Sequence, residues 1–498
     1  MMLPALWSLL ICLIAWLYVK WRGLKSYWAR LGIPYVPAQP LVGSLTFLQR
    51  ENPFTWLRRV YDDHNSPYVG LWLFQRPALL INSPEIARNV LVKDFNNFRD
   101  RFLSSGSSDP TGALNLFTVN DPIWTALRKR LSGVFTLAKL KSLQPLSISK
   151  SNELIQRIAM EKSENLSLRS LFSDITTDII GAAAFGVAGD ATLTGDSPMR
   201  AVTREFMKFS LHRGIAWCSI FFWPELVDIF RFTMFPKSSI RYFKKVFHIL
   251  IEQRKDSVDK GEDPKDLLGA LVKLRKEKEC EDVVFSDDLI VSQGAIFLQG
   301  GYDTTAVTLA FGIYELAYNP EYQERLYSEL LEAKINNNNS EFDTQTLSEL
   351  VHLNCVIKET LRMYPAMGWL DRIAANDYQI DEKLTIRAGT PIYVNVVGMH
   401  YDPKYFPNPK KFMPERFLPE NEKTITPYTY MPFGEGPRAC IGSRFSKMNL
   451  QHILSRIIIA YEVSPQPNSP KPCDVKMEKH ALFLAPGENL YVKFIPRK

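Results

Sequence analysis

The sequence predicts a mainly α fold with minor β-structure. Helical hydrophobic periodicity dominates from about residue 46 to the C-terminus. A long apolar stretch at residues 295–318 indicates a central helix, and short alternating segments at 68–81 and 391–397 indicate strands. We therefore expect residues 46–498 to form one domain.

Composition narrows the class of protein. The 498 residues are 46% hydrophobic, which is ordinary for a globular protein with a substantial core. Six cysteines are scattered without paired spacing, which argues against a disulfide framework and favours a reducing compartment. The net charge of +7 comes from basic residues that are spread out, so an acidic protein partner or an anionic membrane fits better than nucleic acid.

Residues 1–20 are predicted to be a membrane anchor. Residues 3–19 form an apolar run near the short limit for a membrane span. Basic residues follow it directly, which predicts a cytosolic body. A cleaved signal peptide would carry its charges on the other side, and a mitochondrial presequence would be Arg-rich and amphipathic. Residues 21–45 are expected to be a basic, proline-containing linker, because Pro34, Pro37 and Pro40 disfavour helix and sheet pairing.

The most specific motif surrounds a single cysteine near the C-terminus. It reads Pro432-Phe433-Gly434-Glu435-Gly436-Pro437-Arg438-Ala439-Cys440-Ile441-Gly442. Glycines permit a tight turn close to a flat cofactor, and backbone N–H groups aimed at a thiolate tune it as a metal ligand. The spacing resembles the haem-binding loop of cytochrome P450. That resemblance makes Phe433, Gly436, Arg438 and Cys440 cofactor-binding residues, with Cys440 as the axial iron ligand.

The expected central helix is interrupted by Gly300-Gly301-Tyr302-Asp303-Thr304-Thr305. Interior glycines cost about 1 kcal/mol each relative to alanine, so the segment indicates either room for a ligand or a kink for helix packing. It resembles the oxygen-activating stretch of the P450 central helix. The resemblance makes Asp303 and Thr304 the catalytic pair that passes protons to an iron-bound oxygen.

Other positions match the family with less specific motifs. Glu359, Arg362 and Arg416 resemble the buried triad that braces the proximal haem side, although an exposed i,i+3 ion pair would be the commoner interpretation of the first two. Trp124 and Arg128 lie one turn apart, and the family uses this pair, with Arg372, to bind haem propionates. The histidines form no metal cluster in the sequence, and His400 is interpreted as a structural loop residue.

Aromatic residues are dense between positions 201 and 240. They could form core, or they could contact a membrane and lipophilic substrates, and the pattern leaves both open. Further residues expected to line a pocket are Phe98, Phe102, Phe117, Met367 and Trp369.

Because these motifs occur in the family's order, the chain is identified as a member of the microsomal cytochromes P450, similar to the clan of insect detoxification and vertebrate drug-metabolising enzymes. An insect origin is expected. The resemblance implies haem b held between the central helix and the cysteine loop, and insertion of one oxygen atom from O2 into a small lipophilic substrate. It also implies electrons from NADPH through NADPH–cytochrome P450 reductase, with cytochrome b5 as an optional second partner, and an endoplasmic reticulum membrane location with a cytosolic catalytic domain over residues 46–498.

Two alternatives remain open from the residues. One is a dedicated biosynthetic P450 that dehydrates or rearranges a single metabolite. The other is a non-enzymatic membrane protein that binds haem or lipid, which the Asp303-Thr304 pair disfavours, because binding alone does not need a proton path.

Overall fold

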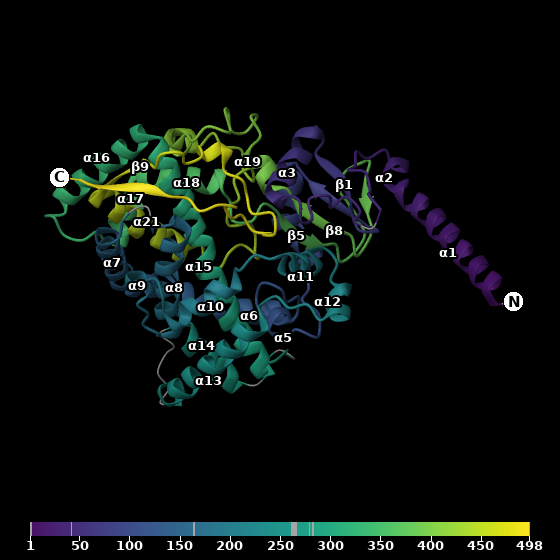
Figure 1. Ribbon diagram of the computed structural model, residues 1–498, viewed down its shortest axis with the longest axis horizontal. Helices are drawn as coiled ribbons and strands as arrows, with labels where there is room; N and C mark the ends of the chain where they lie inside the picture. Colours follow the sequence, from purple (N-terminus) through teal and green to yellow (C-terminus); the bar gives the residue numbers. More distant parts are fainter. Residues whose placement is uncertain are drawn as a thin grey trace.

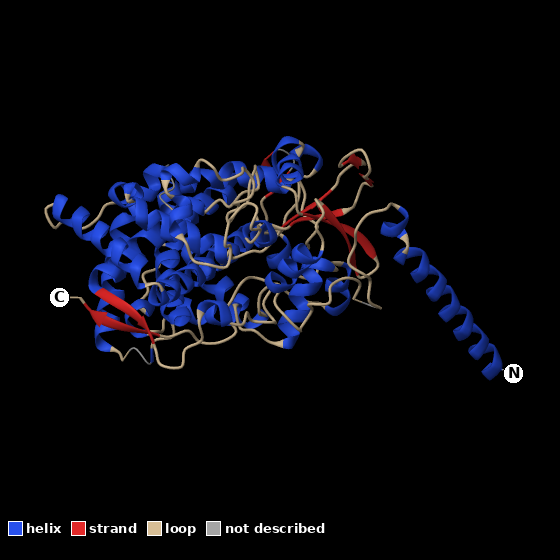
Figure 2. Ribbon diagram, turned by 90° about the horizontal axis from the view of Figure 1, so that it is seen from above, coloured by secondary structure: helices blue, strands red, loops and turns tan. Residues whose placement is uncertain are grey.

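The computed structural model describes residues 2–40, 42–162, 165–259, 266–277, 279–280 and 283–497. Helices make up most of the molecule, and the strands are few and short (Figures 1 and 2), which confirms the predicted mainly α class with minor β-structure. The helices are α1 (Met2–Lys25), α2 (Tyr27–Arg30), α3 (Pro53–Asp63), α4 (Pro84–Arg88), α5 (Pro110–Ala113), α6 (Ile123–Leu131), α7 (Leu137–Met160), α8 (Leu168–Phe185), α9 (Ala191–Thr194), α10 (Pro198–Phe206), α11 (Leu211–Phe222), α12 (Glu225–Phe230), α13 (Lys237–Asp259), α14 (Leu267–Glu277), α15 (Asp287–Tyr318), α16 (Pro320–Asn336), α17 (Thr344–Glu349), α18 (Val351–Met363), α19 (Val396–His400), α20 (Pro419–Glu422) and α21 (Ser443–Ala460). The strands are β1 (Tyr68–Leu73), β2 (Arg76–Ile81), β3 (Glu279–Cys280), β4 (Val283–Val284), β5 (Leu370–Ile373), β6 (Tyr378–Gln379), β7 (Thr385–Ile386), β8 (Pro391–Val394), β9 (Tyr461–Pro465) and β10 (Val492–Pro496).

Helix α15 is the centre of the helical body and contains the predicted helix at 295–318. It begins at Asp287, directly after the N-cap Ser286, whose hydroxyl accepts a hydrogen bond from the Leu289 N–H at 3.2 Å. Side chains are buried on all sides of α15, which is the pattern of a helix inside a core. Helices α8, α18 and α21 pack against it. The central helix is therefore enclosed by neighbours along most of its length.

A small sheet lies at the end of the molecule nearest α1 (Figures 1 and 2). Its strand order is β1-β2-β8-β5, and only the β2–β8 pair is parallel. Strand β8 ends at Val394, so it is shorter than the predicted segment 391–397. Asn395 explains the early end, because its side chain accepts a hydrogen bond from the Gly398 N–H at 3.0 Å and caps α19.

The N-terminal segment forms helix α1, which extends away from the body in Figure 1. Among the residues that the structure describes, none of the helices is both long and apolar enough to cross a membrane. The predicted anchor therefore stays a prediction.

Part of the predicted linker, residues 21–45, packs on the sheet. Trp28 is fully buried, and its indole N–H donates to the Leu71 carbonyl at 3.0 Å. Gly70 makes this contact feasible, since a Cβ there would lie 2.4 Å from the Trp28 ring. The division into anchor, linker and catalytic domain stays a prediction.

Candidate active site

The cysteine loop folds as a tight turn stabilised by its own backbone. Gly434 and Gly436 have φ angles of 71° and 75°, which disfavour other residues. A Cβ on Gly436 would also lie 2.0 Å from the Leu91 carbonyl oxygen. The Cys440 N–H donates to the Phe433 carbonyl at 2.8 Å, closing the loop. The backbone conformation of this turn therefore requires glycine at positions 434 and 436 of the motif.

The side chain of Cys440 is flanked by protein but keeps accessible surface. Burial by the surrounding chain raises the pKa of Cys440, while a hydrogen bond from the Gly442 backbone and the charge of Arg128 oppose that rise. Its side chain nevertheless keeps accessible surface. A Cβ on Gly442 would meet nothing within 4 Å. The accessible surface of Cys440 and the open space beside Gly442 leave the sulfur open to approach by a ligand.

Buried guanidinium groups come together near this loop. Burial, followed by repulsion from Arg101, lowers the pKa of Arg372 to about 9 and that of Arg438 to about 9. Burial also lowers the pKa of Arg128. Within the described part of the chain, Arg372 Nε has no hydrogen-bond partner. Arg438 Nη2 lies 3.6 Å from Asp100 Oδ1, and the remaining donors of these buried cations fit a group that carries carboxylates.

Trp124 and Arg438 are in direct contact. The Arg438 guanidinium lies 4.3 Å from the centre of the Trp124 ring and donates to the backbone carbonyls of Arg99 and Val119. Trp124 and Arg128 both lie on α6, and Arg372 lies on β5. The structure thus brings the predicted cofactor residues from separate elements to one end of the cysteine loop.

The two central glycines have different roles, which separates the two interpretations of the motif. A Cβ on Gly301 would lie 2.5 Å from Ile180 of α8, so this glycine allows close helix packing. Gly300 is exposed within an otherwise buried part of α15, and a Cβ there would meet nothing within 4 Å. Packing therefore explains Gly301, and open space beside the helix explains Gly300.

Asp303 and Thr304 point to different partners. The Thr304 hydroxyl donates to the Gly300 carbonyl at 2.9 Å, beside the open space. Asp303 is buried and accepts from Arg169 of α8 at 3.0 Å. One residue further, the Thr305 hydroxyl lies 3.1 Å from the Ser446 hydroxyl of α21, the helix that follows Cys440. The two motifs therefore lie on elements in contact.

The predicted triad is formed and buried. Glu359 accepts from Arg362 at 2.7 and 2.9 Å and from Arg416 at 3.3 Å. Glu359 and Arg362 are completely buried, so the common alternative of an exposed ion pair is wrong here. The Met413 N–H also donates to Glu359 at 2.9 Å. A carboxylate with this many donors can remain charged without water.

Comparison with known proteins agrees with these contacts. The family model of cytochrome P450 matches residues 33–494. Cytochrome P450 6k1 of Blattella germanica is 33% identical over 498 residues, covering 96% of this chain and 95% of that protein. Probable cytochrome P450 6g2 of Drosophila melanogaster is 34% identical over 463 residues, covering 87% and 88%. The chain belongs to the cytochrome P450 family.

As a cytochrome P450, the protein is a monooxygenase, and its family implies haem with cysteine-ligated iron and the use of O2. The residues present fit such a group. Buried arginines offer donors for its carboxylates, Gly300 and Gly442 leave space beside two elements in contact, and the Cys440 thiol keeps accessible surface.

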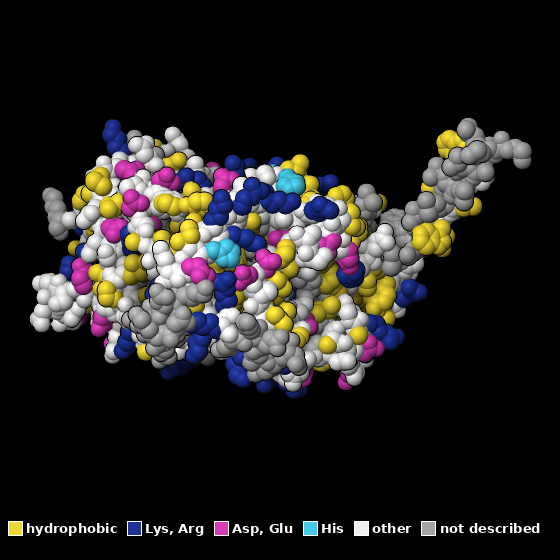
Figure 3. Space-filling model, turned by 90° about the horizontal axis from the view of Figure 1, so that it is seen from below, with side chains coloured by type: hydrophobic (Ala, Val, Ile, Leu, Met, Phe, Trp, Pro, Cys, Tyr) yellow, Lys and Arg dark blue, Asp and Glu magenta, His cyan; other side chains and the backbone are white. Residues whose placement is uncertain are grey.

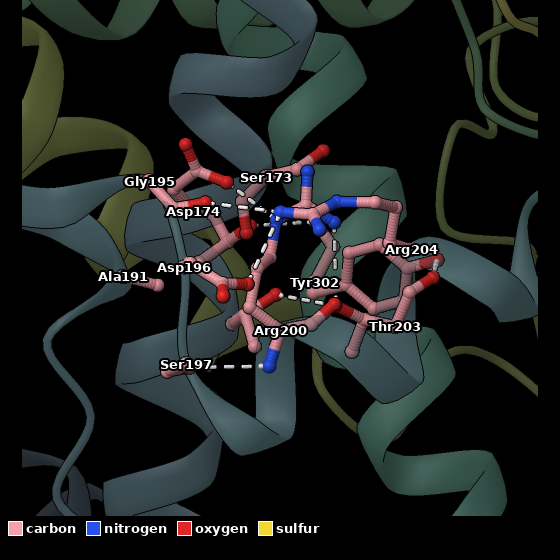
Figure 4. A network of polar contacts seen from close by, with 12 residues as sticks. Ser173, Asp174, Ala191, Gly195, Asp196, Ser197, Arg200, Thr203, Arg204 and Tyr302 are labelled. Carbon is pink, nitrogen blue, oxygen red and sulfur yellow. Dashed lines mark hydrogen bonds and ion pairs between the residues drawn. The ribbon is translucent and has the colours of Figure 1, made fainter. Parts of the chain in front are cut away.

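Sequence reasoning missed a buried polar network behind α15, drawn in Figure 4. Asp174 of α8 accepts from Arg157 at 2.7 Å and from the Nε of Arg200. The Tyr302 hydroxyl donates to the Thr203 carbonyl at 2.7 Å, which attaches α15 to α10 immediately before Asp303. Its signal in the sequence is the aspartate inside the apolar run of α8, but the partners come from distant segments.

The aromatic residues predicted to line a pocket lie in different parts of the structure. Phe117, Trp369 and Phe483 have ring centres 6.1, 6.0 and 6.0 Å from that of Phe221. The Leu116 N–H donates to Gln293 of α15 at 2.8 Å, which places this cluster beside the central helix. We call these four rings the aromatic cluster.

Three other predicted pocket residues lie outside the aromatic cluster. Phe98 is buried among the residues of the sheet and packs edge-on against Tyr378, so its assignment to a pocket is wrong. Phe102 lies under the guanidinium of Arg76. Met367 is partly buried against the main core. Phe98, Phe102 and Phe117 are close in the sequence, but this closeness does not show which of them packs on the sheet and which packs beside the central helix.

Proposed function

We propose that this protein is a haem-thiolate monooxygenase that inserts one oxygen atom from O2 into a small lipophilic substrate. The observation that carries the proposal is the accessible thiol of Cys440, held in a glycine turn close to buried arginines. In this proposal Cys440 is the iron ligand, and Phe433 and Gly436 shape the loop around it.

Arg128, Arg372 and Arg438 hold the cofactor carboxylates in this proposal, with the Trp124 indole beside them. When bound, haem supplies the binding and reductive activation of O2, which thiolate donation favours. The chain itself supplies the positive charges that would neutralise the cofactor carboxylates. Pairing with carboxylates would offset the cost of burying Arg372 and Arg438, whose pKa values burial lowers. Cofactor binding should therefore stabilise the fold.

Thr304 and Asp303 carry the proton path. The Thr304 hydroxyl now donates to the Gly300 carbonyl, so its own oxygen remains able to accept a proton or a hydrogen bond from the open space. Asp303 is held by Arg169, and a proton must reach Thr304 either past this ion pair or after it opens. The pair lies one turn from Gly300, where a ligand can approach the backbone.

The substrate class follows from the aromatic cluster. Phe221 and Trp369 of this cluster are buried, whereas Phe117 and Phe483 keep accessible surface, and accessible apolar surface binds lipophilic molecules. A small apolar cavity of about 20 Å³ is lined by Trp369 and, on the side of the sheet, by Phe47, Trp56 and Leu71. A dedicated biosynthetic enzyme remains the second candidate, because the same apolar lining would suit a single metabolite.

Electrons come from NADPH through a reductase in this proposal, with cytochrome b5 as an optional donor. A net charge of +7 supports an acidic partner. On the face drawn in Figure 3, Lys and Arg side chains form a row among interspersed acidic ones. The apolar run at 3–19 and the basic residues after it support attachment to the endoplasmic reticulum membrane with the catalytic domain in the cytosol. Membrane flotation of the full chain and of a variant lacking residues 1–25 tests the attachment, and equal flotation would contradict it.

The first experiment is the carbon monoxide difference spectrum of the reduced protein expressed in membranes. We expect the strongly red-shifted Soret band of thiolate-ligated haem, and we expect Cys440→Ser to abolish it. Cys473→Ser, the same substitution at an exposed cysteine outside the loop, is the matched control and should keep the band. A folded, haem-loaded preparation without this band would remove the thiolate ligand and the proposed function.

A further inference from the structure

His400 lies between the buried triad and the start of the cysteine loop. It is the last residue of α19 and is completely buried. Its Nδ1 lies 2.9 Å from the Arg362 carbonyl oxygen, and its Nε2 lies 3.0 Å from the backbone nitrogen of Met431. A single ring thus joins α18 to the segment that leads into Cys440.

The chemistry of the two partners determines the protonation of the ring. A carbonyl oxygen can only accept a hydrogen bond, so Nδ1 must carry the proton. A backbone N–H can only donate, so Nε2 must present a lone pair. Only the neutral ring with its proton on Nδ1 satisfies both contacts. Burial agrees with this, because it lowers the pKa of His400 to about 3.

The contacts on either side of His400 are continuous. On one side, Arg362 donates to Glu359 and also, through Nη1, to the His400 carbonyl at 2.7 Å. The ring and the backbone of His400 are therefore both bonded to the same arginine residue. His400 cannot shift relative to the triad without losing two hydrogen bonds.

On the other side, the Met431 carbonyl accepts from the Gly434 N–H at 3.0 Å. The Phe433 carbonyl accepts from the Cys440 N–H at 2.8 Å. Each of these bonds connects neighbouring turns of the same loop. A displacement of Met431 would therefore pass to the backbone of Cys440 through two hydrogen bonds and four peptide units at most.

We propose that His400 is a positioning residue for Cys440, which fixes the place of the sulfur by holding the Met431 N–H in register with the triad. The inference rests on the proposed function, since it treats Cys440 as the iron ligand. His400 touches neither cofactor nor substrate in this account. Its effect should appear in how firmly the thiolate stays on the iron, rather than in substrate selection.

Packing alone is the competing explanation. The His400 ring stacks on Tyr430 with ring centres 5.5 Å apart and an interplanar angle of 21°. His400→Phe keeps an aromatic ring for that stack and removes both hydrogen bonds. His400→Gln reaches about as far as Nε2 and can accept from Met431, whereas His400→Asn reaches only about as far as Nδ1 and can donate to Arg362. The Gln and Asn variants therefore separate the two contacts.

His452 provides a matched control. It is also buried, burial lowers its pKa to about 4, and its Nε2 lies 3.2 Å from the Thr344 hydroxyl. It lies on α21, and its described hydrogen bond leads away from the cysteine loop. His452→Phe thus removes a buried imidazole and its hydrogen bond without cutting the connection to Met431.

The experiment follows loss of the red-shifted Soret band of the reduced, carbon monoxide-bound holoenzyme over time, together with the circular dichroism of the same samples. We expect His400→Phe to lose the band about tenfold faster than wild type, because a buried amide loses its acceptor. His452→Phe should lose it at nearly the wild-type rate while helicity is retained. His400→Gln should be closer to wild type than His400→Asn.

Three outcomes overturn the inference. Equal rates for His400→Phe and wild type would show that the contact with Met431 does not hold the sulfur. Equal rates for the Gln and Asn variants would assign the effect to packing. A wild-type holoenzyme without the red-shifted band would overturn the proposed function itself, and this inference with it, so the two failures are distinguishable.

Discussion

The candidate site has two sides, a proximal side that contains the cysteine loop and the triad, and a distal side along α15 and the aromatic cluster. The two sides are built in different ways. On the proximal side, the cysteine loop is braced by charged groups that are fully buried and hydrogen-bonded, such as Glu359 and Arg362. On the distal side, the aromatic cluster offers apolar rings, and Asp303 has one ion pair. Directional polar contacts determine one geometry, while apolar contacts tolerate many.

This difference suits the two tasks. A metal ligand must stay within a fraction of an ångström of one position, and hydrogen-bond networks achieve that when every member is satisfied. A pocket for lipophilic molecules needs apolar surface rather than a single register. Substitutions on the proximal side should therefore affect folding and cofactor retention, and substitutions on the distal side should affect turnover.

The largest effect is expected for Arg362→Ala. It leaves the Glu359 carboxylate buried with fewer donors, which should cost about 3–5 kcal/mol of unfolding free energy and most of the bound haem. Denaturant unfolding and haem content measure this. Lys358→Ala is the control, because its ion pair with Glu422 is partly exposed and should contribute about 1 kcal/mol or less. Similar losses of unfolding free energy and haem in both variants would contradict the larger contribution expected from the buried ion pairs of the proximal side.

Glu315, near the C-terminal end of α15, lies close enough to the triad to feel the charges of Glu359 and Arg362. It accepts from the Tyr364 hydroxyl at 2.6 Å, and burial raises its pKa to about 7 from the usual 4.5. Below pH 4.5 both the folded and unfolded chains are protonated here. As the pH rises through 7 the folded protein must bury a charge, so this stability contribution is lost.

Glu315→Gln should therefore be more stable than wild type at about pH 8, by up to about 3 kcal/mol, and closer to wild type at about pH 5. The glutamine oxygen can still accept from Tyr364. Thermal unfolding at both pH values measures the difference. The exposed Glu332→Gln should show no such dependence. A variant as sensitive to pH as wild type would assign the dependence to another group.

The smallest effect on stability, and a specific one on catalysis, is expected for Thr304→Ala. The variant should keep its haem spectrum but form roughly tenfold less product per O2 consumed, because the proton path loses its hydroxyl. Oxygen uptake measured together with product yield gives this ratio. Thr308→Ala, one turn further along α15, is the control. Unchanged coupling in Thr304→Ala would contradict the proton-path role.

Predictability from sequence also differed between the two sides. The cysteine loop, Trp124, Arg128 and the triad occur in local motifs whose backbone needs are visible in the residues, such as the positive φ angles at Gly434 and Gly436. The sequence did not reveal Arg169 as the partner of Asp303, because the two residues are far apart in the chain. It also placed Phe98 in a pocket, although this ring packs on the sheet side of the core.

By itself, the sequence determined the mainly α class, the central helix and the thiol with its glycine turn, because helical periodicity and turn geometry are local properties of the chain. Only the tertiary structure decided which glycine opens space and which allows packing, since Gly300 and Gly301 differ solely in what faces them. It likewise decided that His400 joins Arg362 to Met431. Such contacts depend on how distant segments pack, and neighbouring residues in the chain do not encode that packing.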